Sequence, residues 1–166
     1  MIDLAFKTMG TGVVGRPPEA LLPCQARVFV VEDHPVVCLA MTNRFNAEPD
    51  LTVCGQADRA DDAFTQIVAT RPNVAIVDLT LKQGSGLDLI PLLRKACPAT
   101  KILVFSMHYE SYHITQAMRS GAHAYVPKEE GLTQVVSVIR RLLKDCLAAP
   151  LSAPNPLHSH SCAVTR

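Results

Sequence analysis

The sequence has almost no excess of charge of either sign. Its 16 Lys and Arg balance 15 Asp and Glu, which leaves a net charge of +1, and no stretch is strongly basic. Surfaces that follow nucleic-acid phosphates need clustered Lys and Arg. We therefore expect no direct nucleic-acid binding by these residues.

Long apolar segments are absent as well. No run approaches the roughly 20 residues that a membrane span requires. The N-terminus has no charged segment followed by a long apolar stretch, so it is a poor signal peptide. These absences predict a cytoplasmic chain that makes no membrane contact.

The six cysteines include no C-x-x-C pair. They stand at positions 24, 38, 54, 97, 146 and 162, mostly within apolar periodic segments, where a free thiol usually serves as a small core residue. We expect reduced thiols rather than a disulfide framework. The segment "HSHSC" (158–162) contains metal-binding residue types, but such ligands on an irregular tail are more often incidental.

What is present is enough apolar material for one packed domain. Apolar residues make up 48% of the chain, which favours a globular middle segment. Glycines and a Pro-Pro pair interrupt residues 1–25, which predicts a flexible leader. Residues 148–166 are rich in Pro, Ser and Ala and predict an irregular tail. The expected domain is therefore 26–147.

Within that domain, short apolar runs alternate with helical patterns. Five runs rich in β-branched and apolar residues predict strands: 27–31, 51–57, 74–77, 101–106 and 124–126. A helical pattern follows each of them. The clearest is the last, in which Leu132, Val135, Val136 and Ile139 recur at helical spacing.

Local signals mark where these helices begin and end. Pro35 suits the first position of the first helix, which should carry an apolar stripe of Val36, Val37, Ala40, Met41 and Phe45. Asp58 is a candidate cap for the second helix, and Ser85 with Asp88 resembles a capping box for the third. Pro91 lies inside that third helix, and Gly121 should end the fourth.

Five strand–helix units with apolar strands predict an α/β fold. Such strands form a parallel sheet covered by helices on both faces. Right-handed crossovers leave the flavodoxin-like (βα)5 arrangement, with strand order 2-1-3-4-5. Ligands of this fold bind at the carboxyl ends of the first and third strands, where the winding direction reverses.

Polar residues follow four of the five strands at that edge. Glu32 and Asp33 come after the first strand, Asp78 after the third, Ser106 ends the fourth, and Lys128 follows the fifth. Any one of them could simply start a loop. Five together around the expected ligand site favour a functional cluster.

The charges of this cluster predict its chemistry. Three carboxylates repel one another unless a cation is present, and an oxygen-only site favours Mg²⁺. A carboxylate can attack a phosphoryl group and form an acyl phosphate. Asp78 is central and is the best nucleophile, with Glu32 and Asp33 as metal ligands. Lys128 would cover one phosphoryl oxygen, and the Ser106 hydroxyl with nearby backbone amides would cover another.

Four sequence segments resemble motifs of the response-regulator receiver domain of bacterial two-component signalling. They are "VVEDHPVV", "IVDLTLKQGSGLDLI", "VFSMH" and "GAHAYVPKEE", in the family's order and spacing between about residues 27 and 147. Their residues are most similar to those of the NarL/FixJ-like branch of the family. In many members a proline follows the lysine, whereas here Pro127 precedes Lys128. The branch usually continues into a DNA-binding helix-turn-helix, and the segment after residue 147 does not resemble one.

The resemblance implies a phosphoacceptor rather than an enzyme acting on other molecules. Asp78 would accept phosphate from the phosphohistidine of a sensor kinase or phosphotransfer protein. Asp33 and Glu32 would bind Mg²⁺ with the backbone carbonyl of Thr80. Ser106 would move toward the phosphoryl group and let Tyr125 turn inward. The face of the fourth helix, fifth strand and fifth helix would then change for a dimer or a downstream partner in transcription regulation.

Competing interpretations fit less well. A haloacid-dehalogenase-type hydrolase typically has a second carboxylate two residues after its aspartate, where this chain has Thr80. A flavin-binding module would need a phosphate-binding loop after the first strand, where "EDHP" places negative charge instead. A phosphorylation-independent interaction module stays open, since it differs from a working receiver only in whether Asp78 becomes modified.

Overall fold

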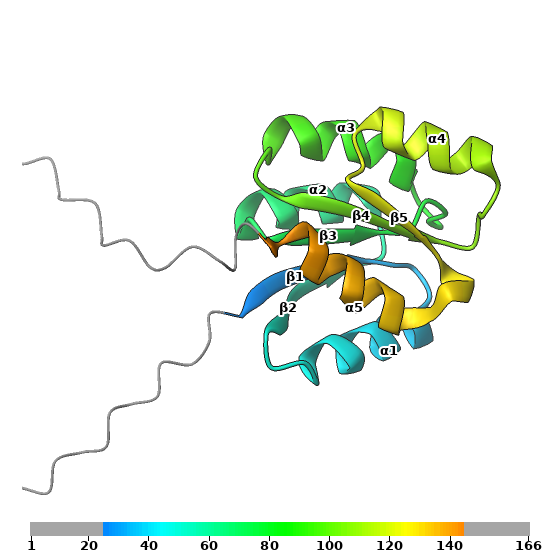
Figure 1. Ribbon diagram of the computed structural model, residues 1–166. Coiled ribbons are helices and arrows are strands. Elements are labelled where there is room, and N and C mark those ends of the chain that lie inside the picture. Colours follow the sequence, from blue (N-terminus) through cyan, green and yellow to red (C-terminus); the bar gives the residue numbers. More distant parts are fainter. Residues whose placement is uncertain (1–24, 145–166) are drawn as a thin grey trace, which may run out of the picture.

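The computed structural model describes residues 25–144 (Figure 1). Its sheet is parallel and has the order β2-β1-β3-β4-β5, so the predicted strand order is confirmed. The strands are β1 (Ala26–Val31), β2 (Leu51–Ala57), β3 (Val74–Val77), β4 (Lys101–Ser106) and β5 (Ala124–Pro127). The helices are α1 (Pro35–Asn46), α2 (Ala60–Thr70), α3 (Gly86–Ala96), α4 (Ser111–Ser120) and α5 (Gly131–Leu142), with a short 3-10 helix, η1 (Lys128–Glu130), before α5.

Helices cover both faces of the sheet, as Figure 1 shows, with α1 and α5 on one face and α2, α3 and α4 on the other. Strand residues alternate between the two cores because successive side chains point to opposite faces. In β1, Val28 and Val30 pack with α1 and α5, whereas Phe29 and Val31 pack with the opposite helices. This double burial explains why the strands are apolar throughout.

Several expected helix signals are present. Pro35 is the first residue of α1 and Pro91 lies inside α3. The hydroxyl of Ser85 accepts a hydrogen bond from the Asp88 backbone N–H, which caps α3. Gly121 ends α4 at φ 110°, a left-handed conformation that glycine adopts without strain.

Two local expectations were wrong. Arg59, not Asp58, is the N-cap of α2, because the chain there pairs with the β3–α3 loop and the Ala60 N–H donates to the Gln83 carbonyl. In α1, Val36 is 80% exposed and Ala40 is also exposed. Only one side of α1 faces the sheet, and Met41 and Phe45 fill that side.

Some expectations fall on residues that the structure does not describe. The leader and the tail, with Cys24, Cys146, Cys162 and "HSHSC", lie outside 25–144. Within the described residues, Cys38, Cys54 and Cys97 are free thiols. In that same part of the chain, every helix is too short or too polar to cross a membrane.

Candidate functional site

The register of the two central strands brings the predicted acidic residues together. Val31 of β1 pairs with Val77 of β3, and the Asp78 N–H donates to the Val31 carbonyl at 3.0 Å. The next residues, Glu32, Asp33 and Asp78, therefore share one sheet edge. They are only 3%, 6% and 3% exposed. Three carboxylates with so little water around them need compensating positive charge.

Lys128 supplies part of that charge. Its Nζ donates to Asp78 Oδ2 at 2.6 Å and to Glu32 Oε2 at 2.7 Å. Burial lowers the pKa of the Lys128 ammonium, but the hydrogen bonds and charges of Asp78 and Glu32 outweigh that effect and hold its pKa above the usual value. Lys128 is therefore charged at neutral pH and joins β5 to the ends of β1 and β3.

Asp33 is held by the loop that follows β3. Its Oδ2 accepts from the Lys82 backbone N–H at 2.9 Å, and the Lys82 Nζ donates to the Asp33 carbonyl at 3.2 Å. Its buried Oδ1 accepts no hydrogen bond from the residues that the structure describes, although the exposed His34 ring places Nδ1 2.8 Å away. A buried carboxylate oxygen free of hydrogen bonds suits a metal ligand.

The acidic cluster fits Mg²⁺. Oxygen atoms of Glu32, Asp33 and Asp78 lie within 4.8 Å of one another, with His34 Nδ1 beside them. Mg²⁺ prefers carboxylate and carbonyl oxygens and takes one or two carboxylates. Among the described residues, the Lys128 ammonium contacts two of the three carboxylates, which leaves negative charge for a divalent cation to balance. The backbone carbonyl of Thr80, two residues after Asp78, remains a predicted Mg²⁺ ligand.

A turn after β3 shapes the other side of the site. The Thr80 N–H donates to Asp78 Oδ1 at 3.2 Å, and Thr80 pairs with Ser85 in an isolated bridge. Gly86 closes this turn against the strand: a Cβ there would lie 1.9 Å from the Asp78 carbonyl oxygen. Only glycine allows this approach, so Gly86 sets where the Asp78 backbone lies.

The predicted switch residues lie along β4 and β5. Ser106 is fully buried, and its hydroxyl has no hydrogen-bond partner among the described residues. The half-buried Tyr125 donates its hydroxyl to the His108 carbonyl at 2.5 Å, and burial raises the pKa of this phenol. Tyr125 is thus a half-buried strand aromatic that is tied to the β4–α4 loop.

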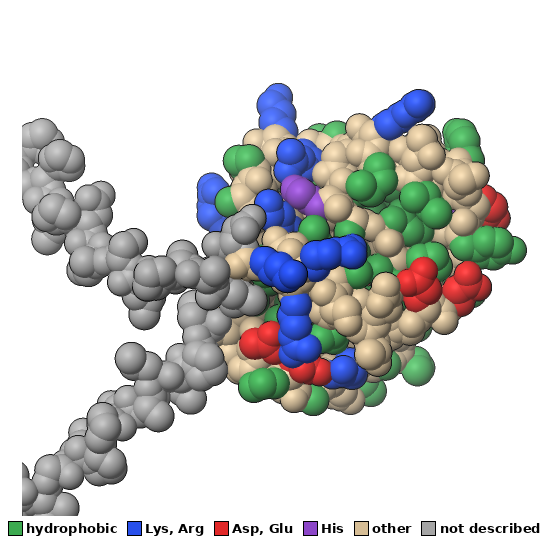
Figure 2. Space-filling model, viewed as in Figure 1, with side chains coloured by type: hydrophobic (Ala, Val, Ile, Leu, Met, Phe, Trp, Pro, Cys, Tyr) green, Lys and Arg blue, Asp and Glu red, His purple; other side chains and the backbone are tan. Residues whose placement is uncertain are grey.

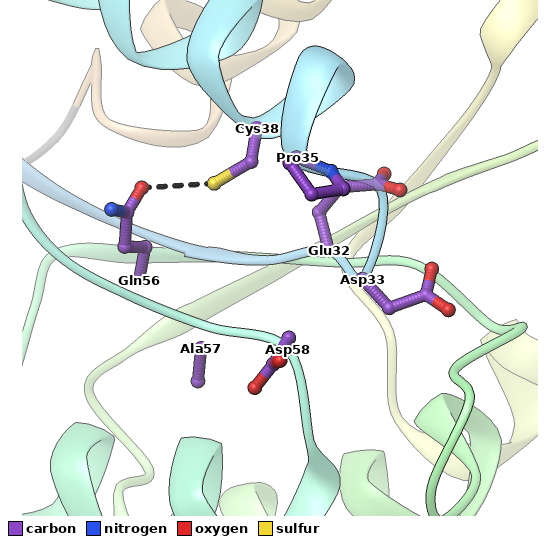
Figure 3. Close-up of a pocket in the computed structure, with 7 residues that line it drawn as sticks. All are labelled: Glu32, Asp33, Pro35, Cys38, Gln56, Ala57 and Asp58. Atoms are coloured by element: carbon purple, nitrogen blue, oxygen red, sulfur yellow. Dashed lines mark hydrogen bonds between the residues drawn. The ribbon is translucent and has the colours of Figure 1, made fainter.

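A cavity of about 250 Å³ opens beside the acidic pair (Figure 3). Cys38 lines it and donates its thiol to Gln56 Oε1 at 2.9 Å. Burial and then the charge of Glu32 raise the pKa of the Cys38 thiol, which favours its protonated form. In Figure 3 the Asp33 carboxylate points away from Cys38.

Sequence reasoning missed three neighbours of the site. His34 contacts the acidic pair, Lys82 holds Asp33, and His108 contacts both Thr80 and Tyr125. Their positions depend on loop conformation. In the sequence His34 directly follows "ED" and His108 lies two residues after Ser106, but nothing in this spacing indicated the contacts.

Comparison with known proteins identifies one family. A family model described as the response regulator receiver domain matches residues 28–140. Among curated proteins, the chain is 32% identical over 133 residues to "DNA-binding transcriptional activator DevR/DosR" of Mycobacterium tuberculosis, a match that covers 76% of this chain and 61% of that protein. The chain spans 55 to 65% of the length of the first curated relatives it matches.

Solved structures agree with this result. A LuxR-family two-component response regulator from Aurantimonas matches with a TM-score of 0.69 and 30% identity, over 73% of this chain and 86% of that one. The signal receiver domain of NarL from Mycobacterium tuberculosis matches with a TM-score of 0.68 and 26% identity, over 77% of this chain and all of that one. Both similarities extend over most of the described fold.

Proposed function

The chain belongs to the response regulator receiver domain family, and from this premise we propose that it is a phosphorylation-dependent switch. Asp78 accepts a phosphoryl group from the phosphohistidine of a sensor kinase or phosphotransfer protein. The observation that carries the proposal is the buried pairing of Asp78 and Glu32 through Lys128, at 2.6 and 2.7 Å. A folded core gains little from burying three carboxylates around one ammonium, whereas phosphoryl transfer needs such charges close together.

In the proposed reaction, an Asp78 carboxylate oxygen attacks phosphorus in line with the leaving group. The phosphorus–nitrogen bond to the donor histidine breaks, its electron pair returns to the imidazole, and an acyl phosphate forms on Asp78. Lys128 already contacts Asp78 Oδ2 and would move its charge to a phosphoryl oxygen. The unpartnered Ser106 hydroxyl would donate to another.

Glu32 and Asp33 would hold Mg²⁺ together with Asp78 and the Thr80 carbonyl. When bound, the ion would supply positive charge that offsets the negative charge of the phosphoryl oxygens. The contribution of this chain is to keep the carboxylates buried and oriented, through the Lys82 N–H on Asp33 and the Lys128 ammonium on Glu32.

The signal would leave through the face made by α4, β5 and α5. Phosphorylation adds charge and acceptor oxygens, which only one arrangement of the surrounding loops can satisfy. Movement of Ser106 toward the phosphoryl group would alter the β4–α4 loop, which Tyr125 contacts through the His108 carbonyl. We propose that this face binds a second copy of the chain or a partner in transcription regulation. The protein would act in the cytoplasm and would not catalyse reactions of other molecules.

The proposal is tested by incubating the protein with Mg²⁺ and acetyl phosphate or a phosphohistidine donor, followed by intact mass measurement. We expect a labile adduct of one phosphoryl group. It should be absent from Asp78→Ala and reduced in Asp33→Ala. The control is Asp58→Asn, which removes an exposed carboxylate that lines the neighbouring cavity but lies outside the acidic cluster, and it should leave the adduct unchanged.

The alternative is an interaction module that works without phosphorylation. Because such a module does not depend on phosphorylation of Asp78, the alternative predicts that Asp78→Ala keeps full partner binding. Absence of an adduct on the unmodified protein, despite Mg²⁺ binding seen by calorimetry, would favour this second reading.

A further inference from the structure

A second group of metal-binding side chains lies where β4 passes into α4. His108 is in the loop, Glu110 is the N-cap of α4, and His113 is in its first turn. Nitrogen and oxygen atoms of the three side chains lie within 4.8 Å of one another. Glu110 and His113 form a Glu-x-x-His pair, the helical spacing that brings a carboxylate and an imidazole to the same side.

The spacing inside this group leaves room for an ion. Glu110 Oε2 lies 3.9 Å from His108 Nδ1 and 3.9 Å from His113 Nε2, and both distances are too long for hydrogen bonds. The two imidazole rings face each other at 4.4 Å between centroids. A tetrahedral metal with bonds of about 2.0 Å holds its ligand atoms about 3.3 Å apart. Small rotations of three partly exposed side chains would close the difference.

An independent contact orients one of the imidazoles. His108 Nε2 lies 3.1 Å from the Thr80 hydroxyl, while its Nδ1 faces Glu110. Metal-binding histidines characteristically give their second ring nitrogen to such a partner, which fixes the tautomer and directs the other nitrogen to the metal. With Nε2 protonated toward Thr80, Nδ1 presents its lone pair to the gap.

We propose that His108, Glu110 and His113 form a binding site for Zn²⁺, with water completing the coordination. Two imidazoles and one carboxylate are a donor set that suits zinc and not Mg²⁺, so this site is chemically distinct from the acidic cluster. It also touches the switch: the His108 carbonyl accepts the Tyr125 hydroxyl. An ion held by His108 would restrain the loop to which Tyr125 is attached.

The test is a Zn²⁺ titration of the full chain against a chromophoric chelator, with excess Mg²⁺ to fill the acidic cluster. Because "HSHSC" could also bind zinc, His158, His160 and Cys162 are first replaced by Ala. This background should still bind one equivalent of Zn²⁺. His113→Ala and Glu110→Gln should each weaken binding at least about tenfold, since even the loss of an outer partner of a metal ligand costs about 10- to 100-fold.

Two control variants make the result specific. Thr115→Ala, an exposed change on the same helix, should leave the zinc affinity unchanged. His34→Ala should also leave it unchanged, because His34 lies in the acidic cluster. Far-UV circular dichroism verifies that each variant is folded. Co²⁺ in place of Zn²⁺ should give a visible spectrum of nitrogen and oxygen ligands without a thiolate charge-transfer band.

Several outcomes would overturn the site. Binding that disappears with the tail substitutions places the ion on the tail. Binding that is lost in His34→Ala places it in the acidic cluster. An affinity that is unchanged in both His113→Ala and Glu110→Gln excludes these side chains as ligands.

Discussion

Single residues decide the charge balance of the site, and Lys128 is the first of them. Replacing it by Met leaves Glu32 and Asp78 buried without their ammonium partner. Breaking a buried ion pair on one side costs about 3 kcal/mol or more, so we expect Lys128→Met to lose about that much in unfolding free energy without Mg²⁺. Added Mg²⁺ should stabilise it more than the wild type. Denaturant unfolding with and without Mg²⁺ measures both effects.

The matched control is Lys82→Met, because the Lys82 side chain is exposed and its one contact within the described part of the chain is with a backbone carbonyl. Its loss should stay under about 1 kcal/mol. Equal losses of unfolding free energy in the two lysine variants would contradict the proposal that Lys128 stabilises the buried carboxylates.

The raised pKa of Lys128 also predicts an alkaline limit. A cation whose folded pKa lies above its unfolded value of 10.5 stabilises the fold fully below that pH, and the contribution disappears as pH rises through the folded pKa. The wild type should therefore lose stability above about pH 10.5 more steeply than Lys128→Met. Parallel unfolding free energies of the two proteins across that range would show that the ammonium is not paired as described.

Gly86 affects the site because its lack of a side chain leaves room for the Asp78 backbone. In Gly86→Ala the added methyl would meet the Asp78 carbonyl oxygen at 1.9 Å, so the strand end or the α3 start must shift. We expect a loss of about 1–3 kcal/mol in unfolding free energy, as overpacking typically costs. The rate of phosphorylation by acetyl phosphate should fall as well. Gly131→Ala is the control: its φ is 75°, and an added Cβ there would meet no described atom within 4 Å, so it measures backbone strain without a clash.

At the scale of elements, Arg140 joins α5 to the turn between α1 and β2. It donates to both carboxylate oxygens of Asp50, at 2.8 and 2.7 Å, and also to Glu48, which Arg44 contacts too. In Figure 2, basic and acidic side chains lie side by side near α5. Hydrogen bonds from Arg44 and Arg140 lower the pKa of Glu48, and the hydrogen bond from Arg140 lowers the pKa of Asp50.

Carboxylates with a depressed folded pKa stabilise the fold above their unfolded pKa, here 4.5 and 3.8, and lose that effect as pH falls. Arg140→Ala should therefore be slightly less stable at neutral pH and lose less stability below about pH 4.5 than the wild type. Thermal unfolding from pH 7 to acid measures the difference, which high salt should reduce. Arg141→Ala, the exposed neighbour, is the control. The interpretation fails if both variants have the same acid profile.

At the scale of the whole molecule, the sequence predicted the parts that follow from periodicity and topology. Apolar strands buried on both faces leave one sheet order, and that order places Asp78 beside Glu32 and Asp33. Contacts made by loops were not predictable in this way. The capping role given to Asp58 failed because a second loop pairs with that segment, and the hold of Lys82 on Asp33 depends on the same loop.

The global stability of the chain should report on Mg²⁺ through Asp33. This side chain adds a third buried carboxylate to the cluster, and within residues 25–144 nothing donates a hydrogen bond to its Oδ1. Asp33→Asn keeps an acceptor for the Lys82 N–H and removes the repulsion, so without Mg²⁺ it should be more stable by about 1 kcal/mol, typical of relief at a functional site.

Mg²⁺ that binds only the folded wild type should raise its unfolding free energy by about 2.7 kcal/mol at a hundredfold excess over Kd. Asp33→Asn should lose most of this gain, so added Mg²⁺ reverses the order of stability of the two proteins. Asp58→Asn should keep the full gain, because its carboxylate is outside the cluster. An equal Mg²⁺ gain in Asp33→Asn and the wild type would show that Asp33 does not bind the ion.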